Sequence, residues 1–344
     1  MARPRKKLIF AILEVLRRYT DRQHTLNQND IAELLERDFD IAADRKSIKR
    51  NLTSLWEMGF PIEFAETLRM YPGKDGKLEE SYIQHDFWLD RDFTDSELRL
   101  LIDSLLFSKH IPHSQRKELI EKLEGLSNRY FKSRTGYIST LQENAPCNRE
   151  LFYTIEVLDE AIAAGKQVAF TYNSYGTDKK LHPRREEAYI VSPYQMVATH
   201  SKHYLLGSYP DSRELANYRV DRITGIRMLD TPARPIQELQ GMENGLHLPQ
   251  HMAEHIYMFG GESVPVTFRM NKAIVNDVID WFGTNVTFFD ETQDQVTARV
   301  IVNRQAMRLW ALQYCLHITV LAPDDLAAQL QQDLQAAAAR YQGE

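Results

Sequence analysis

The stretch DIAELLERDFDIAADRKSIKRNLTSLWEMGFPIEF, residues 30–64, decides how the first part of the chain folds. Its first half has apolar residues at helical spacing, which predicts a helix that Asn27 or Asn29 can cap. Its second half predicts another helix, which Gly59 stops and Pro61 keeps from resuming. The apolar face of this second helix is predicted to consist of Ile48, Leu52, Leu55 and Trp56.

The segments on either side of this stretch complete a recognisable layout. Residues 8–19 carry apolar side chains at helical spacing, which predicts a helix. Residues 62–89 alternate on both sides of the turn sequence PGKDGK, which predicts a β-hairpin. Three short helices followed by a hairpin are typical of a winged helix-turn-helix.

The polar face of the predicted helix after residue 44 is cationic. Long cationic and hydroxylic side chains on an exposed helix suit DNA, since phosphates supply affinity and Arg or Lys can read guanine in the major groove. A solvated helix face is the alternative, and hairpin cations can serve solubility alone. The candidate DNA-binding residues are Arg45, Lys46, Ser47, Lys49, Arg50 and Thr53, with Arg69, Lys74 and Lys77 of the hairpin as phosphate contacts.

Composition limits the class of protein. The chain has 344 residues, enough for two or three domains, with 43% apolar residues, 26% charged residues and a net charge of −6. It lacks an apolar run of membrane-spanning length, and its two cysteines, Cys147 and Cys315, are too few for a disulfide framework. A cytoplasmic protein is expected. No phosphate-binding loop or nucleophile elbow is present, so neither an enzyme nor a cofactor is expected.

The rest of the chain predicts a multidomain α+β protein. Residues 94–131 are helical in pattern, with a capping box at Thr94 and Glu97 and an apolar face, suited to a core or an interface, that consists of Leu98, Leu101, Ile102, Leu105 and Leu106. Residues 143–150 read as a linker. Short, closely spaced strands after about residue 166 predict a small β-barrel, with separate strands at EEAYIV and YQMVAT and another at ELANYRV. From residue 264 strands and helices alternate three times. The predicted domains are 1–92 (DNA-binding), 93–150 (helical connector and dimerisation), 151–232 (barrel) and 262–344 (small α+β domain).

Two arginines stand close together near the end of the barrel segment. In HSKHYLLGSYPDSRELANYRVDRI, residues 200–223, Arg219 and Arg222 lie among apolar and aromatic neighbours. They either hold an anion or form a structural ion pair with Asp221. Because side chains alternate along a strand, the two arginines can share a site only if the strand ends between them.

The first part of the chain resembles the N-terminal domain of the WYL-family transcriptional regulators. Their third helix commonly reads Arg-Thr-Ile, two residues, then Asp-Leu, and is followed by Gly-Phe or Gly-Val-Pro-Ile. This chain has Lys46-Ser47-Ile48, then Arg50-Asn51-Leu52, then Gly59-Phe60-Pro61-Ile62. Lys for Arg and Asn for Asp are departures that bear on which bases are read.

The barrel segment resembles the WYL domain, which is named for a Trp-Tyr-Leu triplet. Here the triplet is His203-Tyr204-Leu205, with His in place of Trp, flanked by Ser192-Pro193-Tyr194 and by Arg219 to Ile223. The resemblance implies an Sm-like barrel that holds a nucleotide or single-stranded nucleic acid and passes the signal to the DNA-binding end. Guanidinium groups for phosphates and aromatic faces for bases suit such a ligand. The implied ligand residues are Tyr172, Arg184, Tyr194, His203, Tyr204, Arg219 and Arg222.

Residues 262–342 resemble the C-terminal extension of these regulators, whose implied role is packing between protomers. Arg304 and Arg308, one helical turn apart, would then face the partner's WYL pocket or, alternatively, solvent. The resemblance thus implies a ligand-responsive repressor that binds duplex operator DNA as a homodimer, a layout also found beside phage-defence operons. The alternative is a nucleic-acid-processing or accessory protein that binds single strands through the barrel.

A third possibility comes from the sequence HMAEH at residues 251–255. It fits the H-x-x-E-H pattern of inverted zinc peptidases, in which two histidines one turn apart bind the metal. No third-ligand helix is evident and a five-residue pattern is easily met by chance. No metal site is therefore expected.

Overall fold

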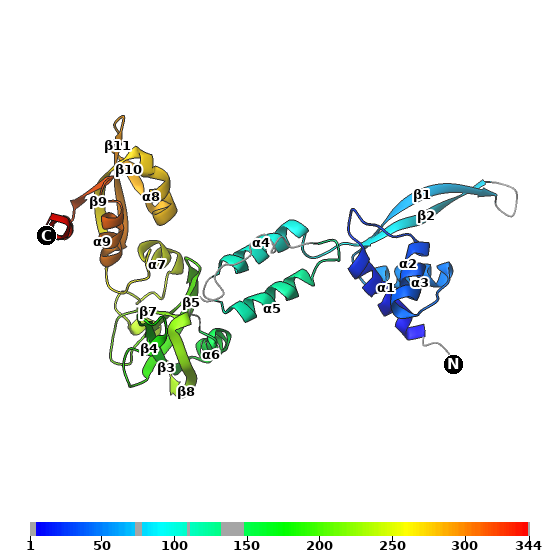
Figure 1. Cartoon of the computed structure of the whole chain (residues 1–344), viewed down its shortest axis with the longest axis horizontal. Helices are drawn as coiled ribbons and strands as arrows, with labels where there is room; N and C mark the ends of the chain where they lie inside the picture. The colour runs from blue at the N-terminus through cyan, green and yellow to red at the C-terminus, as the bar shows by residue number, and fades with distance from the viewer. Residues whose placement is uncertain (1–4, 73–77, 109–110, 132–147, 343–344) are drawn as a thin grey trace. The chain divides into compact units, whose positions relative to one another are not determined.

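A computed structural model describes residues 5–72, 78–108, 111–131 and 148–342. The chain divides into two compact units, residues 1–145 and 146–344 (Figure 1). Both helices and sheets are present in each unit, so the prediction of a mixed α+β, multidomain protein is confirmed. The finer division into four domains stays a prediction.

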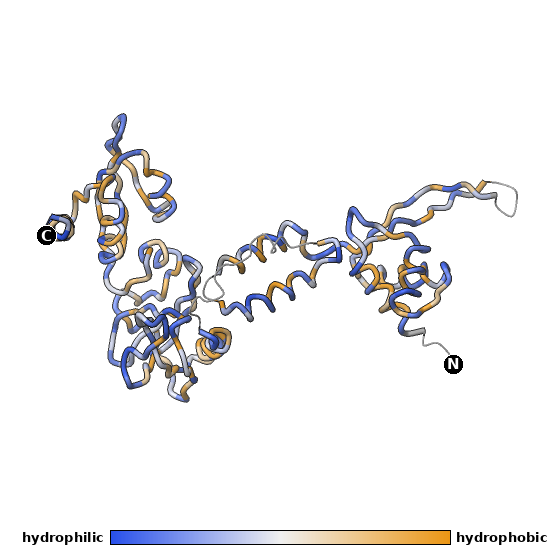
Figure 2. The backbone as a smooth tube through the Cα atoms, in the orientation of Figure 1, coloured by the Kyte–Doolittle hydropathy of each residue, from blue (hydrophilic) through white to orange (hydrophobic). Residues whose placement is uncertain are grey.

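The first unit opens with three helices and a hairpin. In α2 the Asn27 side chain accepts hydrogen bonds from the backbone of Asn29 and Asp30, and Asp44 caps α3 by accepting from the Ser47 backbone. The helices bury one apolar core with the base of the hairpin. Figure 2 shows apolar positions in these helices. The elements are α1 Arg5–Tyr19, α2 Gln28–Phe39, α3 Arg45–Glu57, β1 Ile62–Pro72 and β2 Leu78–Leu89.

The core of the first unit differs from the prediction at Trp56. Ile48, Leu52 and Leu55 are buried as expected, but Trp56 is 55% exposed. It lies in the last turn of α3, and its ring makes an edge contact with the ring of Phe64 on β1. Helical periodicity places Trp56 beside the core face, but it does not show where the neighbouring elements stop.

Two further helices, α4 Asp95–Phe107 and α5 His113–Glu124, form a helical hairpin in the first unit. The predicted capping box at Thr94 and Glu97 is present. Leu98 and Ile102 are buried, whereas Leu101, predicted on the same face, is 40% exposed. Two helices alone cannot enclose a stripe this wide, so part of it stays open to solvent.

The helical hairpin is fastened to the end of α1 by two side chains, Arg91 and Asn128. The Arg91 guanidinium donates to the carbonyl oxygens of Arg17 and Thr20, at the end of α1, and of Leu126, which follows α5. The Asn128 amide donates to the Thr20 carbonyl and, at 2.7 Å, to a carboxylate oxygen of Asp21. These contacts satisfy carbonyl groups that the end of a helix leaves unpaired.

The second unit begins with α6 and a curled sheet. The strand order is β4-β3-β5-β6-β7, and β8 also pairs with β3. Within this sheet β3 pairs with β5, with β8 and, near its end, with β4. The elements are α6 Leu151–Ala164, β3 Lys166–Tyr175, β4 Leu181–Pro183, β5 Tyr189–Thr199, β6 Lys202–Ser208, β7 Ala216–Arg219 and β8 Ile223–Pro232.

Two strand predictions in this sheet are wrong in their bounds. EEAYIV and YQMVAT form the single strand β5, which pairs first with β3 and then, from Ser192, with β6. The change of partner falls beside Pro193, which has no N–H to donate. The predicted strand ELANYRV is shortened to β7, and a 3₁₀ turn over Val220–Arg222 follows it.

The C-terminal part of the second unit is a four-stranded sheet in the order β10-β11-β9-β12, with three helices and one apolar core. The predicted alternation of strand and helix is present, with the short strand β10 added. Trp310, Phe268 and Phe282 pack together in this core. The elements, preceded by α7 Leu248–Glu254, are β9 Ser263–Asn271, α8 Val275–Phe282, β10 Thr287–Phe289, β11 Gln295–Asn303, α9 Arg304–Gln313, β12 Ile318–Ala322 and α10 Asp324–Gln342.

Candidate functional site

The exposed face of α3 carries cations without a partner in the part of the chain that the structure describes. Lys46, Lys49 and Arg50 are exposed, and none has an ion pair or side-chain hydrogen bond within the described residues. Arg45 donates to the Gln28 side chain at 3.4 Å. Glu57, in the last turn, is the one acidic residue of α3. The face is therefore positive and available for contact.

Some surface cations on other helices are paired instead. Arg18 pairs with Glu14 on α1 and Lys122 with Glu118 on α5, each at 2.7 Å and one helical turn apart. Such i,i+4 pairs are how a solvated helix face is usually built. Within the described residues the α3 face has no such pair, so its cations are available to a polyanion.

The other predicted DNA-binding residues are placed as follows. Ser47 and Thr53 are half-buried, and their hydroxyls donate to the Asp44 carboxylate and to the Lys49 carbonyl. Arg69 is exposed in the middle of β1, opposite Ser81. Lys74 and Lys77 lie outside the described residues.

In the curled sheet, Arg219 and Asp221 form a buried ion pair. Arg219 Nε and Nη2 donate to the two carboxylate oxygens of Asp221 at 3.0 and 2.6 Å. The side chains are 17% and 5% exposed. Burial alone would lower the pKa of Arg219, but the hydrogen bonds to Asp221 outweigh it and raise that pKa above its usual value. Asp221 thus takes the structural role that the sequence left open.

Two further cations, Arg222 and Lys202, lie near this ion pair. Strand β7 ends at Arg219 and the 3₁₀ turn brings Arg222 back, so the condition for the two arginines to share a region is met. Lys202 lies near the same groups; burial, followed by Arg219, lowers its pKa. Arg222 Nε is buried and has no hydrogen-bond partner within the described residues. Among the described residues one carboxylate therefore lies near three cations, and we call Lys202, Arg219, Asp221 and Arg222 the cationic cluster.

Tyr204 borders the cationic cluster. It pairs directly with Arg219 across β6 and β7, so the two side chains share a face of the sheet. It is only 9% exposed, and burial raises the pKa of its phenol. His203 is the next residue on β6 and therefore lies on the opposite face. The structure does not bring His203 together with Tyr204 and Arg219.

The remaining predicted ligand residues have structural contacts of their own. Tyr172 is buried, and its hydroxyl accepts from the Arg219 backbone N–H at 3.1 Å. The Arg184 guanidinium lies 5.9 Å from the centre of the Tyr172 ring. Tyr194 shares a 2.7 Å hydrogen bond with Ser208. These aromatic rings are largely covered, so stacking on a base would need one of them to move.

Two residues that sequence reasoning missed lie in this part of the sheet. Lys202 belongs to the cationic cluster, and its place two residues before Tyr204 on the same strand was a usable signal. Arg185 lies 3.7 Å from the centre of the Tyr189 ring and 5.6 Å from that of Tyr209. Nothing in the local sequence pairs Arg185 with Tyr209, which comes from a distant segment.

The turn between β5 and β6 contacts the C-terminal part of the unit. His200 and Ser201 both have positive φ, at 48° and 58°, in a turn without glycine. The His200 ring stacks on Trp281 of α8 at 5.1 Å. The turn is thus held in an uncommon conformation beside Lys202 of the cationic cluster.

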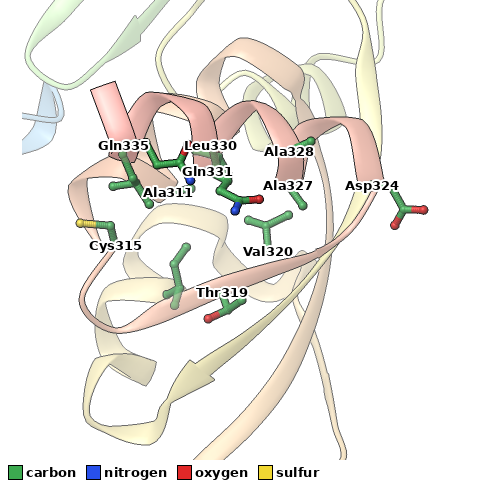
Figure 3. A pocket seen from close by; sticks show the side chains of 12 residues that line it. Ala311, Cys315, Thr319, Val320, Asp324, Ala327, Ala328, Leu330, Gln331 and Gln335 are labelled. Atoms are coloured by element: carbon green, nitrogen blue, oxygen red, sulfur yellow. The ribbon is translucent and has the colours of Figure 1, made fainter. Parts of the chain in front are cut away.

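Arg304 and Arg308 are paired within the chain. Arg304 binds Asp325, and Arg308 forms two 2.6 Å hydrogen bonds with Asp333, both on α10. Figure 3 shows a pocket bordered by α9, β12 and α10, near Cys315. None of the predicted ligand residues lines it.

The H-x-x-E-H histidines stack on each other. The ring centres of His251 and His255 are 4.0 Å apart, and His251 Nε2 is buried without a hydrogen-bond partner among the described residues. No group of three or more His, Cys, Asp or Glu side chains in the described part of the chain is arranged to hold a metal. Stacked rings do not point their nitrogens at one ion, so the geometry does not favour the peptidase alternative.

Stability is expected to fall in acid because of His251. Burial, followed by the nearby His255, lowers the pKa of His251 from 6.5 to about 4. The full stability is present above pH 6.5, and it is lost as the pH falls towards 4, since the unfolded chain takes up the proton first. Urea unfolding at several pH values should show a loss of up to about 3 kcal/mol that His251→Gln lacks. His247→Gln, at an exposed position, should behave like wild type; equal pH profiles for His251→Gln and wild type would contradict the expectation.

Comparison with known proteins gives one family. The WYL domain matches residues 153–228, which contain the cationic cluster and most of the curled sheet. Within the described residues no helix is long and apolar enough to cross a membrane. A search of curated proteins gives no match.

Two solved structures show remote likeness. Proteasome accessory factor B/C (PafBC) of Arthrobacter aurescens is 14% identical with a TM-score of 0.28; the match covers 98% of this chain and 49% of that one. This chain therefore spans about half the length of PafBC. A CRISPR Cas-related protein is also 14% identical, with a TM-score of 0.39 and coverage of 98% and 85%. These TM-scores are too low for either structure to define the fold of this chain.

Proposed function

We propose that the chain is a ligand-responsive transcriptional regulator, without catalytic activity, that binds duplex operator DNA as a homodimer. The observation that carries the proposal is the unpaired cationic face of α3. In this proposal α1, α2, α3 and the β1–β2 hairpin are a winged helix-turn-helix, and α3 enters the major groove. Lys46, Lys49 and Arg50 contact phosphates and guanine edges, and Arg69 contacts a phosphate.

The proposed sensor is the WYL segment, folded as an Sm-like barrel. Its cationic cluster has charge in excess of one carboxylate, so an anion of the nucleotide or single-stranded nucleic-acid class is the proposed ligand. Arg222 and Lys202 supply positive charge beyond that of Arg219. Repression is the proposed outcome of DNA binding. For the ligand to regulate DNA binding, the ligand must bind either the high-affinity or the low-affinity state of the protein better than the other.

Binding measured by fluorescence anisotropy tests this function. The probes are the duplex upstream of the chain's own gene, a scrambled duplex and short single strands, at two salt concentrations. The upstream duplex should bind tightest, with an affinity that falls steeply as salt rises. Tight binding of single strands with no preference among duplexes would instead support the accessory-protein alternative.

A further inference from the structure

The β1–β2 hairpin has an apolar face that no described element covers. Leu68 pairs with Tyr82 and Met70 with Glu80, so these four side chains share one face of the two-stranded ribbon. Leu68, Met70 and Tyr82 are 47%, 48% and 60% exposed. Apolar positions along the hairpin are visible in Figure 2. A ribbon of two strands is only marginally stable in water unless another surface packs on it.

This face continues the side of β1 that packs on the helices. Ile62 is buried in the core of the first unit and Phe64 packs against that core, and both share the alternation of Leu68 and Met70. Figure 1 shows the hairpin running on past the helices. The strand therefore keeps the alternation of a core strand beyond the point where described elements cover it. We call the exposed surface formed by Leu68, Met70, Glu80 and Tyr82 the arm face.

The charge of the hairpin argues against nucleic acid as the partner of the arm face. Residues 62–89 contain six acidic residues and three lysines or arginines. Glu80 lies on the arm face itself, whereas Arg69 lies on the opposite face. A phosphate backbone would be repelled by such a surface. The fitting partner is apolar at its centre and cationic at its edges.

The outer face of α1 has this chemistry. Phe10 is 72% exposed, and Lys7 and Arg17 are exposed on either side of it at spacings of three and seven residues, which places them along one face. Glu14 is already paired with Arg18, so it does not neutralise the others. Lys7 and Arg17 have no ion-pair partner within the described residues.

We propose that the arm face of one protomer docks on the outer face of α1 of a second copy of this chain. Leu68 and Met70 lie about 7 Å apart along the strand, and Phe10 and Arg17 lie about 10 Å apart along the helix, a difference that long side chains can bridge. Leu68, Met70 and Tyr82 pack around the partner's Phe10, and Glu80 approaches the partner's Arg17. The contact rests on the homodimer of the proposed function and leaves the α3 face and Arg69 free.

Photocrosslinking of the full chain locates the partner of the arm face. Tyr82→p-benzoylphenylalanine places the probe on the arm face, and Tyr71→p-benzoylphenylalanine places it on the opposite face of the same ribbon, where Tyr71 is 44% exposed. Irradiation of the Tyr82 variant should give a dimer-sized product, with the label mapped by mass spectrometry to residues 7–18, and the Tyr71 variant should give little. A crosslink to duplex DNA, to another surface of the second copy, or to no second copy would overturn the proposal.

Charge exchange provides an independent test. Glu80→Arg and Arg17→Glu should each raise the dimer dissociation constant roughly tenfold, measured by sedimentation without DNA, and the double variant should restore it. Failure of the double variant to restore it overturns the arm contact. Duplex binding by wild type is measured separately, so an arm contact that fails beside a dimer that still binds DNA leaves the proposed function standing.

Discussion

Replacing Lys49 and Arg50 together with alanine is expected to weaken duplex binding roughly 100-fold, since each phosphate or guanine contact is worth about 1–3 kcal/mol. Both side chains are exposed and unpaired, so the protein should fold as before. The slope of log affinity against log salt should also fall by about two, one for each lost phosphate contact. Anisotropy titrations of the upstream duplex at several salt concentrations measure both quantities.

The matched control for this variant lies on α5. Lys117→Ala combined with Lys122→Ala removes the same net charge, from cations that pair with Glu121 and Glu118. This control should bind the duplex within about twofold of wild type if contact geometry decides affinity. Equal losses in both double variants would mean that total charge, and not the α3 face, determines binding.

The second large effect is expected at the buried ion pair. Arg219→Ala leaves the Asp221 carboxylate buried without its guanidinium, and breaking such a pair typically costs about 3–5 kcal/mol of folding free energy. Replacing both residues, as Arg219→Met with Asp221→Leu, should recover most of this loss, because neither member of the pair is then left as a buried charge without its partner. Urea unfolding of the two variants and wild type provides the comparison.

Arg222→Ala is the matched comparison for the folding stability of the same cluster. Arg222 is half-buried and its guanidinium Nε has no partner among the described residues, so its removal should cost less than about 1 kcal/mol. If Arg219→Ala proved as stable as Arg222→Ala, the pair with Asp221 would not be the main role of Arg219.

The sequence predicts helices and strands well where one local pattern determines the fold. Asn27, Thr94 and the α3 face follow from caps and from helical periodicity, which depend on residues a few positions apart. Trp56 was wrongly expected in a core, because exposure depends on where distant elements end; Leu101 was expected in a core or an interface and is 40% exposed. The bounds of β5 and β7 likewise depend on which strands they pair with, and no local pattern contains that information.

The candidate site was predictable in residue type more than in arrangement. Arg219, Arg222 and Tyr204 do lie in one region, and alternation along β6 would have added Lys202. The same alternation separates His203 from them, which the triplet resemblance concealed. The ion pair of Arg219 with Asp221 could be named as an alternative but not chosen, because the choice depends on burial in three dimensions.

The fastening of Arg91 to three carbonyl groups has a mechanical consequence. Its planar guanidinium contacts Arg17, Thr20 and Leu126 at once, so we expect the helical hairpin and the end of α1 to move together. A displacement of α5 should therefore also displace α1 and, through the apolar core that α1 and α3 share, α3. The helical hairpin is thus mechanically coupled to α3, the helix that carries the exposed cations.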